Sequence, residues 1–311
     1  MSSSLTLFSG PHTRDIAEQM RSLSGDVTLG TIRWDSFPDN WPKTFIEEAD
    51  AVRGRDVAFL AAFEDPSDIF AQMSVLYALP RYEANSLTVF LPFFSTGTMD
   101  RVDRSGEIVT AATLARMLSA IPHCHGKGPA RIVISDIHAL QERFYFSDNV
   151  VPVLISAIPL LKKRLREEPD ADRISIAYPD EGAYKRFHGQ FDEYPQIVCN
   201  KRRDGAKRVV TIKDGNPRGR HAVIVDDLIM TGGTALECKM ALSAAGAAQT
   251  SLYATHPVFP DASWRRFLDK GFRRIWVTDS CPTTAHAARN ARSFEVLSQA
   301  PLLTQFLLER R

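Results

Sequence analysis

Apolar and polar residues alternate along this chain in blocks that predict strands and helices in turn. Apolar runs typical of strands buried on both faces of a parallel sheet cover residues 56–62, 87–94, 131–140, 174–177 and 222–225. Helical segments are predicted among them, with examples at 13–22, 67–79 and 109–118. A first short strand is expected at 5–10. This alternation predicts an α/β fold built on doubly wound, mostly parallel sheets flanked by helices.

The pattern recurs at a constant offset, which predicts two copies of one α/β unit. Gly54 and Gly219 precede matching strands, and 219 − 54 is 165; Pro92 and Pro257 end the next strands, and 257 − 92 is again 165. We therefore expect one domain over residues 1–158 and a second over 159–311, with the last helix packing back on the first domain.

Composition narrows the class of protein. The chain has 311 residues, 24% charged and 44% hydrophobic, with a net charge of +1, so no global charge points to nucleic acid or a membrane. Its four cysteines form no C-x-x-C pair, which favours reduced thiols. No apolar run is as long as a membrane span, and residues 1–4 lack the basic and apolar parts of a secretory signal. A cytoplasmic enzyme is expected.

The most informative stretch is residues 223–246, where an apolar strand leads into two acids, a Gly/Thr loop and a helix. Asp226 and Asp227 are expected to follow the strand, and Thr234 with Glu237 predicts a capping box. Backbone donors at a helix N-terminus suit a phosphate monoester, and carboxylates beside them can accept hydrogen bonds from sugar hydroxyls. The sequence therefore predicts a sugar-phosphate site.

Further candidate residues follow other strands. A long polar loop follows Pro92 at 93–106, where ligands bind in open α/β sheets. Asp136 and His138 are two residues apart in an extended stretch, so they are expected to share a face and meet one cation, although Asp-x-His at a strand end is more often structural. His123-Cys-His125 is interpreted as a solvated loop. Residues 197–215 predict a hairpin with a cluster of cations, which is either a solvated surface or a flap that closes over phosphates.

The segment Asp226-Asp-Leu-Ile-Met-Thr-Gly-Gly-Thr234 resembles the phosphoribosyl-pyrophosphate (PRPP) binding loop of type I phosphoribosyltransferases and PRPP synthetases. Over nearly the whole chain, the order and spacing of the motifs resemble PRPP synthetase (ribose-phosphate pyrophosphokinase). The motifs that carry this resemblance are Phe8-Ser-Gly10, Val52-Arg-Gly54, Asp136-Ile-His-Ala139, Pro179-Asp180, Lys201-Arg-Arg203 and Ala254-Thr-His256. The resemblance implies two tandem type I phosphoribosyltransferase-like domains.

It also implies an activity, which is transfer of the β,γ-diphosphoryl group of Mg-ATP to the C1 hydroxyl of ribose 5-phosphate, giving PRPP and AMP. Mg²⁺ is the implied cofactor, with ligands Asp136, His138 and Asp180. Lys201 and Arg203 would act on the transferred group. The residues implied for ribose 5-phosphate are Asp226, Asp227, Thr231, Gly232, Gly233 and Thr234, and those for ATP are Phe37, Asp39, Thr98, Asp100, Arg101 and His138. A homo-oligomer is implied, because Phe37 and Asp39 should reach adenine from a neighbouring subunit.

Two motifs depart from those of most synthetases. Thr98-Met99 stands where they carry Arg-Gln, and Met230 stands where they carry an acid. The segments Phe93–Thr98, Leu140–Phe146 and Lys185–His188 instead resemble the phosphate-independent, plant-type branch. Two alternatives stay open at this point, namely a phosphoribosyltransferase that consumes PRPP and a catalytically silent, synthetase-like regulatory subunit.

Overall fold

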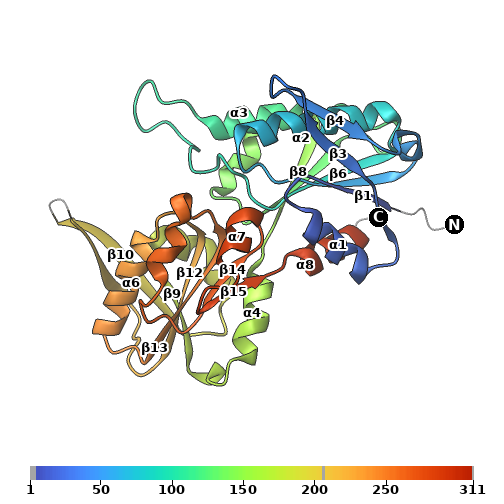
Figure 1. The fold of residues 1–311 in the computed structure, drawn as a ribbon. Coiled ribbons are helices and arrows are strands. Elements are labelled where there is room, and N and C mark those ends of the chain that lie inside the picture. Colours follow the sequence, from blue (N-terminus) through green and yellow to red (C-terminus); the bar gives the residue numbers. More distant parts are fainter. Residues whose placement is uncertain (1–4, 205–206, 310–311) are drawn as a thin grey trace. The chain divides into compact units, whose positions relative to one another are not determined.

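The structure is a computed structural model that describes residues 5–204 and 207–309; the side chains of residues 201–209 lie outside the description. The chain divides into two compact units. The first comprises Met1–Ser156 with Ser298–Arg311, and the second comprises Ala157–Leu297 (Figure 1). Each unit is built around one large sheet.

The first unit contains a six-stranded sheet in the order β2-β1-β5-β6-β7-β8, and every neighbouring pair is parallel. Its strands are β1 (Leu5–Ser9), β2 (Val27–Leu29), β5 (Asp56–Leu60), β6 (Ser86–Leu91), β7 (Ala130–Ser135) and β8 (Val150–Ile155). The helices are α1 (Arg14–Leu23), α2 (Pro66–Ala78), α3 (Thr110–Ser119) and α8 (Ala300–Glu309).

The alternation of side chains along each strand explains why helices cover both faces. In β5, Val57 and Phe59 pack in one core cluster with residues of α2 and α3, while Ala58 and Leu60 pack in another with residues of α1 and α8. Because both faces are covered, every residue of β5 is buried. The continuous apolar run at residues 56–60 is a consequence of this two-sided burial.

The second unit contains a seven-stranded sheet in the order β11-β10-β9-β12-β13-β14-β15, parallel except for the β10–β11 hairpin. Its strands are β9 (Ile174–Tyr178), β10 (Gln196–Asp204), β11 (Lys207–Asp214), β12 (His221–Ile229), β13 (Gln249–Pro257), β14 (Ile275–Thr278) and β15 (Phe294–Leu297). Residues of α6 (Gly233–Ala244) pack on one face, and those of α4 (Ile158–Glu167) and α5 (Glu181–Phe187) on the other. The fourth helix of this unit is α7 (Pro282–Ala288).

The two sheets repeat one topology, as the constant sequence offset predicted. Strands β1-β5-β6-β7-β8 and β9-β12-β13-β14-β15 follow the same order in space and along the chain. The turn before β5 and the turn before β12 are also alike. Gly54 and Gly219 both have a φ of 69°, a left-handed conformation that favours glycine. The prediction of an α/β fold with two mostly parallel sheets is confirmed.

A separate two-stranded hairpin of β3 (Ile32–Ser36) and β4 (Pro42–Ile46) belongs to the first unit (Figure 1). Short 3-10 turns complete the chain at Ala49–Val52 (η1), Leu79–Tyr82 (η2), Leu140–Tyr145 (η3), Ala171–Arg173 (η4), His188–Gln190 (η5) and Pro260–Phe267 (η6). Within the described residues, no helix has the length and apolar character required to cross a bilayer.

Candidate active site

The two acids Asp226 and Asp227 lie inside strand β12, near its carboxyl end. The sequence placed them after the strand, and this expectation is wrong. The neighbouring strand β13 runs on to Pro257 and pairs with β12 as far as Ile229, which extends the strand by two residues beyond the acids. Asp227 is buried and Asp226 half-buried. Both carboxyl groups are therefore held on rigid backbone at the edge where α/β sheets bind ligands.

The acids concentrate negative charge. The backbone N–H of Asp227 donates a hydrogen bond to Oδ1 of Asp226 over 3.0 Å. Burial, and then the negative charges of Asp227 and Asp180, raise the pKa of Asp226 well above its ordinary value. Asp180 follows β9, the strand beside β12, so parallel topology brings these three acids to one edge. Hydroxyl donors or a cation bound there would relieve the repulsion.

Residues 230–232 connect β12 to α6, and their conformation depends on glycine. Gly232 has a φ of 78°, and a Cβ at this position would lie 2.3 Å from Cζ of Phe267. A larger residue would therefore be both strained and obstructed. The predicted capping box is wrong, because the N-cap of α6 is Gly232, with no side-chain cap, and Thr234 is already inside the helix. The first backbone N–H groups of α6, including those of Gly233 and Thr234, thus have no intrahelical partner and can serve a ligand.

The β10–β11 hairpin carries the predicted catalytic cations. In its antiparallel register Lys201 pairs with Val210, and Arg203 pairs with Arg208. The side chains of Lys201 and Arg203 lie outside the described residues. Within β10, Sγ of Cys199 lies 3.6 Å from Sγ of Cys238 on α6, and both thiols are buried and free.

In the first unit, Asp136 and His138 follow β7 but do not share a strand face. The strand ends at Ser135, and Asp136 has a φ of 35°, so the extended geometry assumed from the sequence is wrong. Asp136 is buried and donates its backbone N–H to the carbonyl of Ile155 over 2.9 Å, whereas His138 is exposed. The two residues remain at the carboxyl edge of the sheet, brought there by a turn.

The loop after β6 lies against the segment that contains His138. A Cβ on Gly97 would be 3.3 Å from Cβ of His138, and Nε2 of Gln141 donates to Oδ2 of Asp100 over 3.3 Å. The hydroxyls of Ser95 and Thr96 are buried with no hydrogen-bond partner in the part of the chain that the structure describes. The structure therefore brings together the predicted ATP residues Thr98, Asp100, Arg101 and His138. Arg101 is exposed, and its Nε lies 3.1 Å from Oδ1 of Asp103.

Phe37 and Asp39 lie at the tip of the β3–β4 hairpin, outside the main sheet. The ring of Phe37 is 48% exposed, and Nζ of Lys43 lies 5.6 Å from its centroid. Asp39 accepts a hydrogen bond from the backbone N–H of Trp41 over 3.3 Å. An aromatic ring held in solvent on a hairpin tip is available to stack on a ligand or a second molecule.

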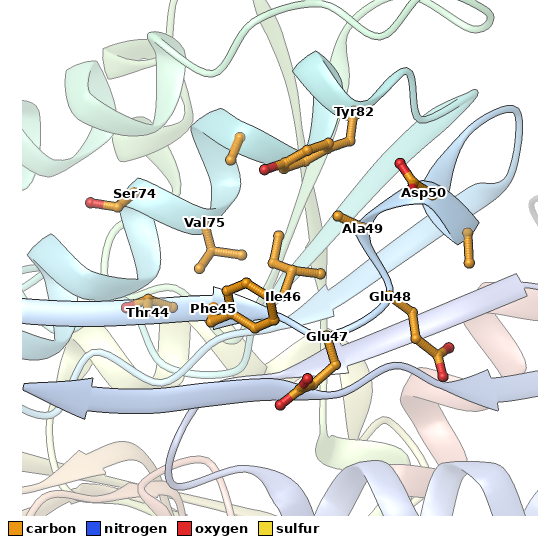
Figure 2. Close-up of a pocket in the computed structure, with 12 residues that line it drawn as sticks. Thr44, Phe45, Ile46, Glu47, Glu48, Ala49, Asp50, Ser74, Val75 and Tyr82 are labelled. Atoms are coloured by element: carbon orange, nitrogen blue, oxygen red, sulfur yellow. The ribbon is translucent and has the colours of Figure 1, made fainter.

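A cavity of about 570 Å³ lies at the other end of this hairpin, between β4 and α2 (Figure 2). Ile46, Val75 and Tyr82 provide apolar walls, while Glu47, Glu48 and Asp50 supply carboxylates. Its described lining contains no Lys or Arg, so the cavity does not suit a phosphate.

A buried polar cluster lies at the ends of β13 and β14; the sequence analysis used Ala254-Thr-His256 only as a motif of the resemblance and gave neither it nor Ser280 a role in a site. Oγ of Ser280 donates to the carbonyl of Thr255 over 2.9 Å, and Nδ1 of His256 lies 3.0 Å from Oγ of Ser280. Thr278 donates to the same carbonyl over 2.7 Å. Asp279-Ser280 follows an apolar strand just as Asp180 does, so the rule used for the other strands would have found it.

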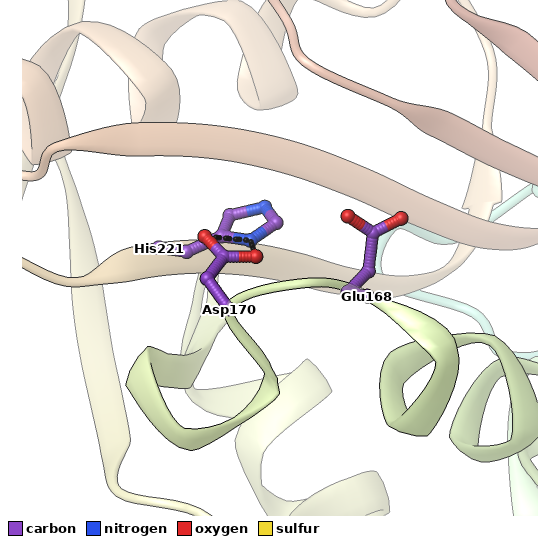
Figure 3. A group of neighbouring side chains, drawn as sticks. All are labelled: Glu168, Asp170 and His221. Atoms are coloured by element: carbon purple, nitrogen blue, oxygen red, sulfur yellow. Dashed lines mark hydrogen bonds and ion pairs between the residues drawn. The ribbon is translucent and has the colours of Figure 1, made fainter.

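A second group of titratable side chains lies at the opposite edge of the second sheet (Figure 3). Ligand atoms of Glu168, Asp170 and His221 all lie within 4.8 Å of one another, a spacing that a metal ion could use. However, Arg273 already bridges the two carboxylates, at 2.7 Å from Glu168 and 3.1 Å from Asp170. Nε2 of His221 is 2.8 Å from Oγ of Ser251 and its Nδ1 is 3.3 Å from Asp170. This cluster is better described as a salt-bridge network that ties strand ends together.

Comparison with known proteins points to a single family. Residues 5–121 match the family model for the N-terminal domain of ribose phosphate pyrophosphokinase. The chain is 52% identical over 301 residues to ribose-phosphate pyrophosphokinase 3, chloroplastic, of Arabidopsis thaliana, covering 94% of this chain and 73% of the relative. It is 49% identical over 306 residues to ribose-phosphate pyrophosphokinase 3, mitochondrial, of Spinacia oleracea, covering 96% and 75%. The crystal structure of phosphoribosylpyrophosphate synthetase from Mycobacterium smegmatis aligns with a TM-score of 0.83 and 25% identity, over 99% of this chain and 100% of that one.

These relatives correct one expectation and support another. The names of the plant relatives include the words chloroplastic and mitochondrial. These names contradict the prediction of a cytoplasmic enzyme and point to an organelle instead. The plant relatives are identical to this chain at about half of the aligned residues, which agrees with the resemblance to the plant-type branch. Identity at this level across nearly the whole chain shows that the protein belongs to the ribose-phosphate pyrophosphokinase family.

Proposed function

We propose that this protein transfers the β,γ-diphosphoryl group of ATP to the C1 hydroxyl of ribose 5-phosphate, producing PRPP and AMP. The observation that carries the proposal is the Asp226–Thr234 segment, in which two acids at the end of β12 lead into a glycine-dependent loop and a helix N-terminus. This segment occurs in a chain about 50% identical to named ribose-phosphate pyrophosphokinases. Its residues offer acceptors for sugar hydroxyls and donors for a phosphate.

In the second unit, each group has a role that follows from its chemistry. The carboxyl groups of Asp226 and Asp227 accept hydrogen bonds from the ribose hydroxyls, and the backbone N–H groups of Thr231–Thr234 donate to the 5-phosphate. Lys201 and Arg203 on the β10–β11 hairpin neutralise the charge that builds up on the transferred diphosphoryl group. The attacking C1 hydroxyl must lose its proton as the new P–O bond forms and the bond to AMP breaks.

In the first unit, the loop after β6 and the turn after β7 are proposed to bind ATP. Thr98, Asp100, Arg101 and His138 surround the nucleotide, and the buried hydroxyls of Ser95 and Thr96 are available as further partners. Phe37 and Asp39 are proposed to contact adenine in a neighbouring subunit. The exposed ring of Phe37 on a projecting hairpin supports a site shared between subunits of a homo-oligomer.

The residues present fit Mg²⁺. Asp136 and Asp180 supply the oxygen ligands that Mg²⁺ prefers, and burial, followed by the negative charges of Asp227 and Asp180, raises the pKa of Asp226, so negative charge is concentrated at this edge of the second sheet. We propose that Asp136 and His138 would hold Mg²⁺ on the phosphates and that Asp180 would lie near a second cation, while Asp226 and Asp227 bind the sugar. When bound, Mg²⁺ neutralises phosphate charge and leaves the β-phosphorus open to attack.

One assay tests the proposed reaction directly. The purified protein is incubated with ATP, with and without ribose 5-phosphate and Mg²⁺, and AMP and PRPP are quantified by chromatography. We expect both products in equal amounts and only when all three components are present. Release of pyrophosphate from added PRPP and a nucleobase would indicate a phosphoribosyltransferase. No turnover under either condition would indicate a silent regulatory subunit.

A further inference from the structure

Segment 258–266 hydrogen-bonds to the carbonyl groups of three consecutive residues, which are the last residue of β12 and the first two residues of the β12–α6 connection. The backbone N–H groups of Val258 and Phe259 donate to the carbonyl of Ile229 over 3.1 and 3.2 Å. Oγ of Ser263 donates to the carbonyl of Met230 over 2.9 Å. Nη1 of Arg266 donates to the carbonyl of Thr231 over 2.7 Å. All of these residues belong to the second unit, and segment 258–266 begins 27 residues after Thr231.

Fixing a carbonyl also fixes the next amide. In a planar trans peptide, the C=O of one residue and the N–H of the following residue point in opposite directions. When Ser263 holds the carbonyl of Met230, the N–H of Thr231 points away from Ser263. When Arg266 holds the carbonyl of Thr231, the N–H of Gly232 points away from Arg266. The two side chains thereby set the direction of two successive donors.

The segment that supplies these side chains is itself held firmly. The backbone of η6 is left-handed at Asp261 and Ala262, with φ of 53° and 54°, which bends the chain sharply before Ser263. Its last residue, Phe267, is buried against the rings of Phe259, Phe272 and Phe294, with ring centroids 5.7–6.4 Å apart. The same Phe267 ring lies under Gly232. The loop is thus supported by one buried aromatic cluster and by two side-chain donors.

We propose that Ser263 and Arg266 are positioning residues that hold the N–H groups of Thr231 and Gly232 toward the 5-phosphate of the substrate. The inference rests on the proposed function, in which this loop binds ribose 5-phosphate. Arg266 acts through its hydrogen bond to the carbonyl of Thr231 and not through its charge, so a neutral side chain that donates to the same carbonyl replaces it. Because the loop binds only the 5-phosphate end of ribose 5-phosphate, loss of this positioning lowers the affinity for ribose 5-phosphate and leaves the affinity for ATP unchanged.

The test compares variants that keep a hydrogen-bond donor at residue 263 or 266 with variants that lack one. Arg266→Met removes every donor, while Arg266→Gln keeps a neutral donor on a side chain of the same length as Met; both side chains are shorter than Arg. Ser263→Ala removes the hydroxyl, and Ser263→Thr keeps it. The matched control is Arg265→Met, because Arg265 is also exposed on η6 but stacks on Trp264, with its guanidinium 5.4 Å from the ring. The readouts are KM for each substrate, kcat, the Kd for ribose 5-phosphate by calorimetry, and Tm.

We expect Arg266→Met to raise KM and Kd for ribose 5-phosphate about tenfold, and Ser263→Ala to raise them about fivefold, the range for loss of one orienting hydrogen bond. KM for ATP and Tm should stay close to wild type. Arg266→Gln and Ser263→Thr should recover most of the affinity, and Arg265→Met should not change it.

Three results would overturn the inference. Unchanged affinity in Arg266→Met and Ser263→Ala would mean that the loop needs no support from η6. Normal affinity in Arg266→Lys, with Arg266→Gln as weak as Arg266→Met, would assign the role to the positive charge. A parallel loss for ATP and ribose 5-phosphate, with a lowered Tm, would indicate a general effect on folding. A wild-type protein that binds no ribose 5-phosphate at all would instead contradict the proposed function from which the inference starts.

Discussion

Asp227 donates its backbone N–H to the carboxylate of its own neighbour, Asp226, over 3.0 Å, within the last residues of β12. The contact orients the Asp226 carboxyl group, whose pKa is raised first by burial and then by the negative charges of Asp227 and Asp180. Hydroxyl donors or a cation that bind there would reduce the repulsion among these carboxyl groups. Its electrostatics therefore favour binding of a sugar, with a cation if one is present, over an empty state.

Asp227→Asn tests this arrangement. The substitution keeps the size of the side chain and removes one negative charge, so we expect affinity for ribose 5-phosphate in Mg²⁺ to fall about tenfold, with a smaller change for ATP. Calorimetric titration of each substrate measures both. Asp172→Asn, at an exposed acid before β9 on the opposite edge of the sheet, is the control and should bind normally. Unaltered sugar binding in Asp227→Asn would show that the acid pair is wrongly assigned.

The basic hairpin gives a second prediction. Lys201→Ala and Arg203→Ala should each lower kcat by about two orders of magnitude, because each removes a cation from the charge that develops in the transition state. Binding of ribose 5-phosphate should change much less. The control is Lys213→Ala on β11, where Nζ is already paired with Glu181 at 2.5 Å. Near-normal turnover in both hairpin variants would leave the hairpin as a solvated surface.

His221 gives a prediction for stability against pH. Burial lowers its pKa, although the carboxylates of Asp170 and Glu168 act in the opposite direction. With a folded pKa below the unfolded value of 6.5, the unfolded state binds more protons in acid. The stabilisation is therefore complete above about pH 6.5 and is lost as the pH falls below it.

Thermal unfolding between pH 8 and pH 5 measures this effect. The wild type should lose stability relative to His221→Gln by at most about 1.4 kcal/mol per pH unit, the value for one proton. His123→Gln, at an exposed histidine in the first unit, should follow the wild type. Identical pH slopes for wild type and His221→Gln would mean that burial of His221 is not linked to folding.

Local patterns were sufficient for the elements and their order. The run at residues 56–62 contains β5 because a strand covered on both faces must be apolar throughout, and this requirement is visible in the sequence. The offset of 165 residues is visible for the same reason, since two sheets with one topology repeat the same burial pattern. The hairpin of β10 and β11 was likewise predicted, from two strand-like segments that flank a turn rich in cations.

Features set by distant pairing were not predictable in this way. Strand β12 continues past its acids because β13 continues beside it. No local pattern in residues 226–229 predicts this pairing. Asp136 leaves the extended conformation at a single residue, which neither burial pattern nor composition encodes. Ser263 and Arg266 are joined to the phosphate loop only by the fold, across more than thirty residues of sequence.

The nucleotide loop leads to the last prediction, which concerns regulation. Thr98 and Met99 are uncharged, and the guanidinium of Arg101 is engaged by Asp103 and lies 4.0 Å from Asp100. With fewer fixed charge-assisted bonds to a nucleotide, discrimination among nucleoside triphosphates should loosen.

A site for inorganic phosphate or ADP would need converging cations, and the densest cluster in the sequence is the hairpin already assigned to catalysis. We therefore expect activity without inorganic phosphate, weak inhibition by ADP, and use of triphosphates besides ATP. Initial rates in a phosphate-free buffer, measured before and after addition of phosphate, test the first expectation. Addition of ADP tests inhibition, and parallel reactions with other triphosphates in place of ATP test the nucleotide range. An enzyme that stays inactive until phosphate is added would belong with the regulated synthetases, and its nucleotide loop would then need a partner for phosphate elsewhere in the chain or in a second subunit.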